Sequence, residues 1–487
     1  MSTLIVVNNP AKWPLHIPDV EVVAAKTYLT DPRYSERKGA KVFNLCRYYT
    51  YQSMGYYVSL LAEARRQRPM PDINTITNLR NLSMPRADEQ DLGEETQRAL
   101  KPLKGDKFAL SVYFGSNMAE RYTRLARMLF NLFPAPFLRA QFEREDGYWE
   151  LKSLGTIPYS EVPETHKPFV QSSATEYLSR NRRGPSKRQR PKYDMAVLYD
   201  PDAEHSPSNE RAIKRFADAA WDLGMNSEVI SKNDYGRLAE FDALFIRETT
   251  AVNHHTYRFA RRAQNLGLVV MDDPLSILRC TNKVYLAELL DHAGISAPRT
   301  VIVHEDNLDD VIVQLGLPCV LKRPDGAFSQ GVMKAKDVGE LRDAIEDMLE
   351  ESDLVLAQEW MPTEYDWRVG VLDGKPLYAC RYHMAAKHWQ IAKHGDGESS
   401  FGKVDTLLVE DAPPKVIDTA VKATKLIGTG LYGVDLKEVD GKAHIIEVND
   451  NPNLDAGYED AILKDELWRT IANSFLQRIE KLRNGTS

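Results

Sequence analysis

The sequence predicts an α/β protein of about three domains, and three observations lead to that prediction. Short apolar runs alternate with stretches of helical periodicity, which is typical of parallel sheets joined by crossover helices. A chain of 487 residues is too long for one hydrophobic core. A polar, locally basic stretch over residues 171–192 separates two such regions and is interpreted as a linker. We therefore expect domains over residues 1–170, 193–280 and 281–487.

Composition and charge exclude several kinds of protein. With 43% hydrophobic and 27% charged residues, the chain is an ordinary globular protein. Its net charge of −7 offers no overall basic surface, so nucleic acid is not expected as a partner. No apolar run reaches the roughly 18 residues that a membrane helix needs, and the N-terminus lacks the basic-then-apolar pattern of a secretory signal. The four cysteines form no CxxC pair, which favours reduced thiols in a cytoplasmic protein.

Residues 1–170 carry an α/β pattern but no motif that indicates a chemistry. Three arginines at residues 121, 124 and 127 share one face of a predicted helix, which is either solvated or a surface for an anionic ligand. The seven basic residues between positions 180 and 192 favour a flexible linker; a contact to RNA or nucleotide phosphates would lack an aromatic platform. Strands are predicted at residues 4–7, 20–23, 41–45 and 107–113, and helices at 51–66 and 119–133.

Residues 193–280 show the alternation of a parallel sheet. Arg247 follows directly after a predicted strand at residues 243–246. Ligands gather at the carboxyl ends of parallel strands, so Arg247 is a candidate for binding a substrate. A surface arginine near a turn is the alternative. The other strands are predicted at residues 195–199, 228–230 and 268–271, with helices at 209–223 and 255–266.

Two lysines stand at positions suited to binding phosphates. Lys283 lies in the first turn of a helix predicted over residues 281–293, where a cation opposes the helix dipole unless an anion is near. Lys322 ends a strand predicted at residues 318–322 and precedes the loop RPDGAFSQG, whose backbone N–H groups can lie over phosphates. The loop does not fit the Walker pattern, and a glycine-containing hairpin with a lysine is the alternative.

Two further strands carry polar groups. The strand at residues 354–361 ends in Glu-Trp-Met, where backbone groups can bind a planar base, although a core strand fits equally well. On the following strand, Asp366 and Arg368 are two residues apart and share a face. They are either a structural salt bridge or part of a ligand site.

The stretch over residues 431–454 is the most informative part of the chain. Two alternating strands flank an Asp-Gly turn, which predicts an antiparallel hairpin. Its pairing would place Asp435 close to Glu447 and Asn449, which share a face of their strand. Oxygen ligands of this kind suit Mg²⁺ held between carboxylates and substrate phosphates. The alternative is a hairpin with a solvated acidic face.

These signals follow the order of a known superfamily. Lys283, Lys322 with its glycine loop, the Gln-Glu-Trp-Met strand end, the Asp366 strand and EVNDNP succeed one another. This order resembles the ATP-grasp superfamily, most closely the branch that includes the ribosomal-protein glutamate ligase RimK and glutathione synthase. The resemblance covers residues 193–480, and the EVNxxP motif twelve positions after Asp435 is its most specific part. The first block is similar, at residues 42–46 and 55–64, to the N-terminal domain often fused to RimK-like ligases.

The resemblance implies an N-terminal α/β domain, a pre-ATP-grasp parallel α/β domain and an ATP-grasp fold of two α+β subdomains. It also implies an ATP-dependent carboxylate–amine ligase that forms a peptide or isopeptide bond through an acyl phosphate, on an amino acid, a peptide or a protein tail. Mg²⁺, or Mn²⁺ in its place, would accompany ATP, and a homo-oligomer is expected. The metal ligands would be Asp435, Glu447 and Asn449. The groups around ATP would be Lys283, Lys322, Gly326, Ser329, Gln330, Gly331, Gln358, Glu359, Trp360, Met361, Asp366 and Arg381. The groups at the reacting carboxylate would be Arg368, Arg247 and Lys387.

The chain departs from the family at one motif. RimK-like ligases usually carry an Arg-Ser-Asn type motif after the Asp/Arg strand, and residues 381–391 lack it. Lys387 or Arg381 would replace that arginine at the γ-phosphate, and Trp389 would shape a different pocket, which leaves glutamate specificity open. The alternative functions are a non-catalytic nucleotide-binding protein that recruits a partner, and an ATP-grasp kinase or acid–thiol ligase.

Overall fold

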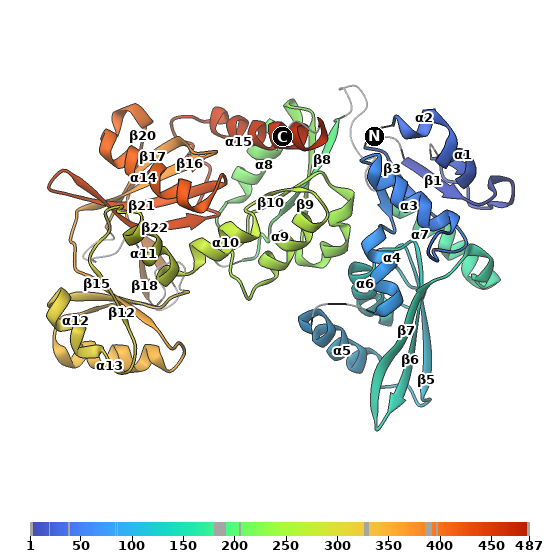
Figure 1. Cartoon of the computed structure of the whole chain (residues 1–487), viewed down its shortest axis with the longest axis horizontal. Coiled ribbons are helices and arrows are strands. Elements are labelled where there is room, and N and C mark those ends of the chain that lie inside the picture. Colours follow the sequence, from blue (N-terminus) through green and yellow to red (C-terminus); the bar gives the residue numbers. More distant parts are fainter. Residues whose placement is uncertain are drawn as a thin grey trace. The chain divides into compact units, whose positions relative to one another are not determined.

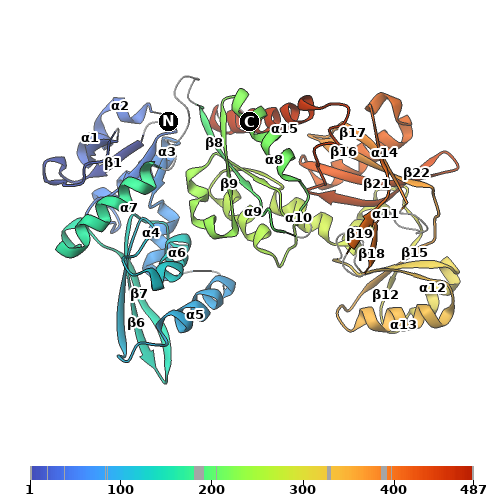
Figure 2. The ribbon, with the colours of Figure 1, turned by 180° about the vertical axis from the view of Figure 1, so that it is seen from behind.

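The computed structural model describes residues 3–18, 20–37, 39–82, 84, 86–179, 191–203, 206–325, 331–384, 392–395 and 398–484. The chain divides into two compact units, residues 1–192 with 234–240 and residues 193–233 with 241–487. Each unit is described by itself (Figure 1, Figure 2). None of the described helices is both long enough and apolar enough to cross a membrane.

A four-stranded parallel sheet, ordered β2-β1-β3-β4, forms one half of the first unit. Both faces of its central strand β1 (Thr3–Val7) are buried: Leu4 and Val6 pack into one core, and Ile5 and Val7 into another. This follows because successive side chains of a strand point to opposite faces. The remaining elements are β2 (Glu21–Ala24), α1 (Ala25–Thr30), α2 (Pro32–Ser35), β3 (Lys41–Asn44), α3 (Met54–Ala64) and β4 (Arg68–Met70).

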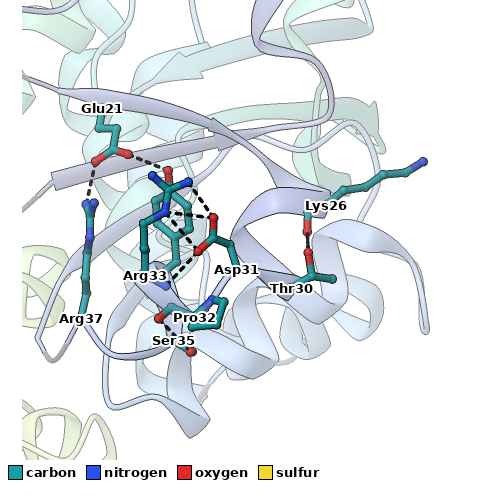
Figure 3. A network of polar contacts seen from close by, with 9 residues as sticks. Glu21, Lys26, Thr30, Asp31, Pro32, Arg33, Ser35 and Arg37 are labelled. Atoms are coloured by element: carbon teal, nitrogen blue, oxygen red, sulfur yellow. Dashed lines mark hydrogen bonds and ion pairs between the residues drawn. The ribbon is translucent and has the colours of Figure 1, made fainter.

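A polar network ties α2 and the residues just after it to β2 (Figure 3). Asp31 caps α2 by accepting a hydrogen bond from the Arg33 backbone N–H at 2.9 Å, and its carboxylate also binds the Arg33 guanidinium. Glu21 accepts hydrogen bonds from the Tyr34 hydroxyl at 2.7 Å and from Arg37 at 2.6 Å. Exposed ion pairs contribute at most about 1 kcal/mol, so the buried ring of Tyr34 is the main anchor.

An antiparallel sheet of β5, β6 and β7 completes the first unit, and the sequence analysis predicts only its strand β5. Its hairpin β6–β7 was not predicted, because those strands mix charged and apolar residues without clean alternation. The linker predicted over residues 171–192 does not begin at residue 171. Helix α7 continues to Ser179, and Ala174 and Leu178 on this helix are buried. The elements are α4 (Ile73–Asn81), α5 (Arg86–Leu100), β5 (Lys107–Tyr113), α6 (Thr123–Leu132), β6 (Phe137–Glu145), β7 (Tyr148–Thr156) and α7 (Lys167–Ser179).

The second unit begins with the predicted parallel sheet, ordered β11-β10-β8-β9. The C-terminal helix α15 packs along α8 beside this sheet, and Phe475 of α15 lies 5.3 Å from Phe245 of β10 between ring centres. The elements are β8 (Tyr193–Leu198), α8 (Glu210–Asp222), β9 (Met225–Ile230), β10 (Ala243–Ile246), α9 (His255–Asn265), β11 (Val269–Met271), α10 (Pro274–Thr281) and α15 (Asp465–Asn484).

A first antiparallel sheet, ordered β12-β15-β13-β14, follows α11. Cys319 and Leu321 of β13 face the core formed with α12 and α13. Lys322 alternates with them and therefore points away from those helices. The elements are α11 (Lys283–His292), β12 (Thr300–Val303), α12 (Leu308–Leu315), β13 (Cys319–Lys322), β14 (Val332–Ala335), α13 (Val338–Leu349) and β15 (Val355–Glu359).

A second antiparallel sheet, ordered β20-β17-β16-β21-β22, is covered on one face by α14. Trp367 and Val369 of β16 pack on the α14 side, so Arg368 between them points to the other face. The predicted α/β fold class, with a parallel sheet followed by two α+β subdomains, is thus confirmed. The elements are β16 (Tyr365–Leu372), β17 (Lys375–His383), β18 (Ala392–Gly395), β19 (Glu398–Phe401), β20 (Val404–Leu407), α14 (Pro414–Ile427), β21 (Leu431–Val439) and β22 (Lys442–Asp450).

Candidate functional site

The hairpin of β21 and β22 brings the three predicted oxygen ligands together. Asp435 lies opposite Glu447 in the strand pairing, and Gly433 lies opposite Asn449. The Asn449 side chain donates a hydrogen bond to Asp435 Oδ2 at 3.1 Å. Two carboxylates and one amide therefore share a face of the sheet, which we call the carboxylate face.

Arg368 on β16 lies directly opposite Asp435. Its Nε donates to Asp435 Oδ1 at 2.6 Å and its Nη2 to Oδ2 at 2.7 Å, a bidentate pair that fixes both side chains. The guanidinium carbon also lies 5.1 Å from the centre of the Tyr382 ring. Burial raises the pKa of Asp435 despite the opposing effect of Arg368. A cation beside Asp435 therefore offsets a large desolvation cost.

The two predicted phosphate lysines reach this face from other elements. Lys283, the first residue of α11, places its Nζ 2.8 Å from Glu447 Oε1. Burial lowers the pKa of Lys322 to about 8; Glu447 acts against this effect, and Lys283 adds to it. Burial acts to raise the pKa of Glu447, but Lys283 and Lys322 hold it below its ordinary value. The charge of Lys283 at the start of α11 is thus compensated by the Glu447 carboxylate of the hairpin.

Asp366 lies on the carboxylate face with a partner that the sequence analysis missed. Lys437 donates to Asp366 Oδ1 at 2.5 Å and to the Thr363 hydroxyl oxygen at 2.8 Å. The Thr363 hydroxyl in turn donates to Asp366 Oδ1 at 3.0 Å. The alternation of side chains along β21 could have revealed this partner, because Lys437 follows Asp435 by two residues and therefore shares its face.

The strand end predicted to bind a planar base lies at the edge of the first antiparallel sheet. Gln358 is buried and donates to the Thr300 hydroxyl at 3.0 Å. The Glu359 carboxylate binds Arg299 Nε at 2.7 Å, and its pKa is lowered because the hydrogen bonds from Arg299 outweigh burial, which acts to raise it. The Glu359 backbone N–H also donates to the Arg299 carbonyl, at 3.0 Å, so side chain and N–H are both engaged within the protein.

The glycine loop and the residues after β15 are partly described. The centre of the Trp360 ring lies 3.5 Å from Lys334 Nζ, and Met361 is the next residue in the chain. Gly331 has a φ of 71°, and the Arg323 backbone N–H donates to its carbonyl at 3.0 Å. Gly331 needs this left-handed conformation to return the chain into β14. Four other predicted site residues lie outside the described residues: Gly326, Ser329, Gln330 and Lys387.

Arg247, predicted to meet a substrate carboxylate, is engaged by protein groups in this structure. Its side chain is fully buried. Nε donates to the Ser208 hydroxyl at 3.0 Å, Nη1 donates to Asn451 Oδ1 at 2.5 Å, and Nη2 donates to the carbonyls of Pro207 and Pro452 at 2.7 Å. These donors bind protein groups, so Arg247 fixes the chain that follows β22.

Replacing Arg247 is therefore expected to destabilise the second unit. Arg247→Met leaves two carbonyls without their donor in a buried place, so unfolding should need about 3 kcal/mol less free energy. Urea unfolding measures this loss, and the exposed Arg261→Met on α9 is the matched control. Equal stability of both variants would contradict the role given to Arg247.

Arg381, predicted to lie near ATP, points to the opposite face of its sheet from Arg368. Cys380 pairs with Arg368, and the next residue of β17 must therefore point to the other side. The Arg381 guanidinium stacks 5.0 Å and 4.8 Å from the ring centres of Tyr365 and Trp367. Arg381 thus covers aromatic rings of the core.

Two buried carboxyl groups lie where β11 and β22 end. Burial raises the pKa of Asp450 to about 7, and burial together with Asp450 raises that of Asp272. The Asn451 backbone N–H donates to Asp272 Oδ2 at 2.7 Å. Asp272 Oδ1 and Asp450 Oδ2 are buried without a partner among the described residues. The native state therefore favours a proton here at pH values where the unfolded chain has released it.

This proton predicts a pH-dependent stability. The native Asp450 keeps its proton up to about pH 7, whereas the ordinary pKa is 3.8, so unfolding becomes easier as the pH rises through that window. Asp450→Asn stays neutral and should be about 2 kcal/mol more stable than the wild type at pH 8, with a flatter slope from pH 5 to 8. Urea unfolding at both pH values tests this, with exposed Asp418→Asn as control. An unchanged slope would contradict it.

The residues of the carboxylate face fit Mg²⁺ bound together with a nucleotide. Asp435, Glu447 and Asn449 supply hard oxygen atoms only, which Mg²⁺ prefers. Among the described residues no three His, Cys, Asp or Glu side chains form a metal site by themselves. The ion would therefore rely on Asn449 and on phosphate oxygens, which Lys283 and Lys322 attract to the same face.

Two family models and several curated proteins match this chain. Residues 25–173 match the model of the RimK-like ATP-grasp N-terminal domain, and residues 280–465 match that of the RimK-like ATP-grasp domain. A probable α-L-glutamate ligase of Vibrio vulnificus is 27% identical over 248 residues, which is 50% of this chain and 78% of that protein. One of Shewanella denitrificans is 29% identical over 256 residues, 51% of this chain and 80% of that protein.

Solved structures with related folds align with part of this chain. D-alanine–D-alanine ligase from Bacillus anthracis aligns with 61% of this chain and all of its own, at 17% identity and a TM-score of 0.48. A RimK domain protein from Sphaerobacter thermophilus aligns with 58% of this chain and 98% of its own, at 18% identity and a TM-score of 0.44. The predicted enzyme class, an ATP-dependent ligase, is confirmed by the ligase relatives and the two domain matches. The chain thus carries a RimK-like ATP-grasp N-terminal domain followed by a RimK-like ATP-grasp domain.

Proposed function

We propose that the chain is a carboxylate–amine ligase that uses ATP and Mg²⁺ to form a peptide or isopeptide bond through an acyl phosphate. One observation carries this proposal: Lys283 binds Glu447, and Lys322 lies close enough to Glu447 for their charges to interact. Groups that attract phosphates and groups that bind Mg²⁺ therefore meet on one face. The substrate classes are an amino acid, a peptide or a protein tail.

The chemistry requires positioning and charge stabilisation. A carboxylate is a poor acyl donor, because its leaving group would be oxide. Attack of a carboxylate oxygen on the γ-phosphorus releases ADP and gives an acyl phosphate. The amine then attacks the acyl carbon, phosphate leaves and the amine loses a proton. Both steps build negative charge on oxygen atoms that must be held still, and the protein need not supply a nucleophile.

The predicted site residues have the following proposed roles. Lys283 and Lys322 hold the α- and β-phosphates, and Asp366 binds the ribose. Mg²⁺, when bound by Asp435, Glu447 and Asn449, neutralises phosphate charge. Arg368 supports the acyl phosphate and the tetrahedral intermediate, from a position fixed by Asp435 and the Tyr382 ring. The strand end at residues 358–361 binds adenine, and residues 325–331 cover the phosphates; Lys387 is proposed at the γ-phosphate.

The amine and acid can be searched for directly. Relatives are named as probable α-L-glutamate ligases, so glutamate is the first amine to test, alone and with short peptides as acids. Release of ADP and phosphate together with a new amide product is expected for at least one pair. Nucleotide binding without turnover on any pair would favour a partner-recruiting protein, and a phosphorylated or thioester product would favour a kinase or an acid–thiol ligase. A homo-oligomer and a cytoplasmic location remain predictions.

A further inference from the structure

Lys437 has no role in the function proposed above, yet it holds a residue of the nucleotide site. We infer that Lys437 determines nucleotide selectivity by orienting the Asp366 carboxylate toward the ribose hydroxyls. The inference rests on the proposed function, because it needs ATP to bind at this face. Lys437 acts through Asp366 and is therefore a positioning residue.

The two described contacts of the Asp366 carboxylate go to the same oxygen atom. Lys437 Nζ and the Thr363 hydroxyl both bind Oδ1, at 2.5 and 3.0 Å. In the part of the chain that the structure describes, no hydrogen bond reaches Oδ2. Two contacts to one oxygen fix the rotation of the carboxylate and keep Oδ2 available as an acceptor. A ribose offers two neighbouring hydroxyl donors, which is the chemistry that such an oxygen recognises.

The ion pair is not needed to join its strands. β16 and β21 already pair from Trp367–Leu436 to Leu372–Leu431, and the Asp366–Lys437 contact lies just beyond the end of that ladder. Both side chains are largely buried, with 18% and 14% of their surface exposed. A buried ion pair gives little net stability over apolar side chains of similar size. A positioning role accounts for charged residues at this place better than a structural one.

Lys437 also sets the charge of the face. Among the described residues counted here, four cations meet three carboxylates, and removing Lys437 would weaken the attraction of these groups for the negatively charged complex of Mg²⁺ and ATP. Lys437 is close enough to Lys322 for their charges to interact. The groups counted are Lys283, Lys322, Arg368 and Lys437 against Asp366, Asp435 and Glu447.

The test titrates the whole chain with ATP, 2′-deoxyATP and 3′-deoxyATP in the presence of Mg²⁺. The wild type is expected to bind ATP about tenfold more tightly than at least one deoxy analogue, because a buried acceptor left without its hydroxyl donor weakens binding. Lys437→Met should weaken ATP binding about tenfold and reduce the preference to less than about twofold. Lys437→Arg should restore the affinity for ATP to within about threefold of wild type.

Two further variants separate positioning from folding. Thr363→Val removes one contact to Asp366 Oδ1 without changing any charge, and it should lower the ribose preference partially. Lys415→Met, an exposed lysine on α14, is the control and should bind all three nucleotides like the wild type. Thermal unfolding identifies any variant that fails to fold.

The outcomes distinguish this inference from the proposed function. A folded Lys437→Met or Thr363→Val protein with the wild-type preference for ATP would overturn the inference. A wild type that binds the three nucleotides equally would also overturn it while leaving the proposed function intact. A wild type that binds none of them would overturn the proposed function and this inference together.

Discussion

Replacing Glu447 by glutamine is expected to lower kcat for the ligase reaction about a hundred- to a thousandfold while leaving the chain folded. Glu447 supplies a carboxylate to the proposed metal site and binds Lys283 at 2.8 Å. Glutamine keeps the size of the side chain but removes the charge that a divalent cation needs. Electrostatic groups aimed at developing charge contribute roughly 3–4 kcal/mol each, which is the scale of such a loss. ADP release with an accepted acid and amine is the measurement.

A control comes from the same hairpin. Glu438 lies on β21 but points to the α14 side, where its Oε2 accepts a hydrogen bond from Trp367 at 3.1 Å. Glu438→Gln keeps an acceptor for that bond and should have near-normal kcat. Near-normal turnover of Glu447→Gln would reject the metal assignment.

Removing the charge of Lys322 is expected to weaken binding of Mg²⁺ and ATP by about 30- to 150-fold. Lys322→Met loses a buried cation that is proposed to hold a phosphate, and such charge-assisted contacts are worth about 2–3 kcal/mol. Kd from a calorimetric titration measures the change. Lys336→Met, an exposed lysine just after β14, is the control and should bind like the wild type.

The low pKa of Lys322 adds a pH dependence with a defined sign. Burial lowers its pKa to about 8, and the protonated form is the one that binds phosphates, so affinity for ATP should fall as the pH rises from 7 to 9. Lys322→Arg remains charged throughout this range and should flatten the slope. A wild-type affinity that does not change with pH, or a Lys322→Met affinity equal to wild type, would contradict the assignment.

The hairpin site could be predicted because its geometry is local. A two-residue spacing puts Glu447 and Asn449 on one face, and an Asp-Gly turn sets which residues pair, so Asp435 had to lie nearby. Lys283 and Lys322 came from the resemblance and from their positions at element ends. These inferences needed only neighbouring residues and the order of motifs.

The sequence did not reveal the surroundings of Arg247, Arg381 and Lys437, because these depend on pairing and packing between strands. The position of Arg247 after a strand said nothing about burial, and its partners Pro207 and Pro452 are distant in sequence. The face of Arg381 depends on whether residue 380 or 381 pairs with Arg368, which a sequence does not specify. Lys437 resembles a solvated strand residue until Asp366 is seen beside it.

The central claim is that nucleotide and Mg²⁺ bind between the strand end bearing Lys322 and the hairpin bearing Glu447. Calorimetry of Mg²⁺ and ATP with the wild type, Lys322→Met, Glu447→Gln and the double variant tests it most directly. We expect each single variant to bind more weakly and the double variant to lose less than the product of both effects, because the two side chains act on one ligand. Wild-type affinity in both single variants, or losses that multiply as for independent sites, would contradict the claim.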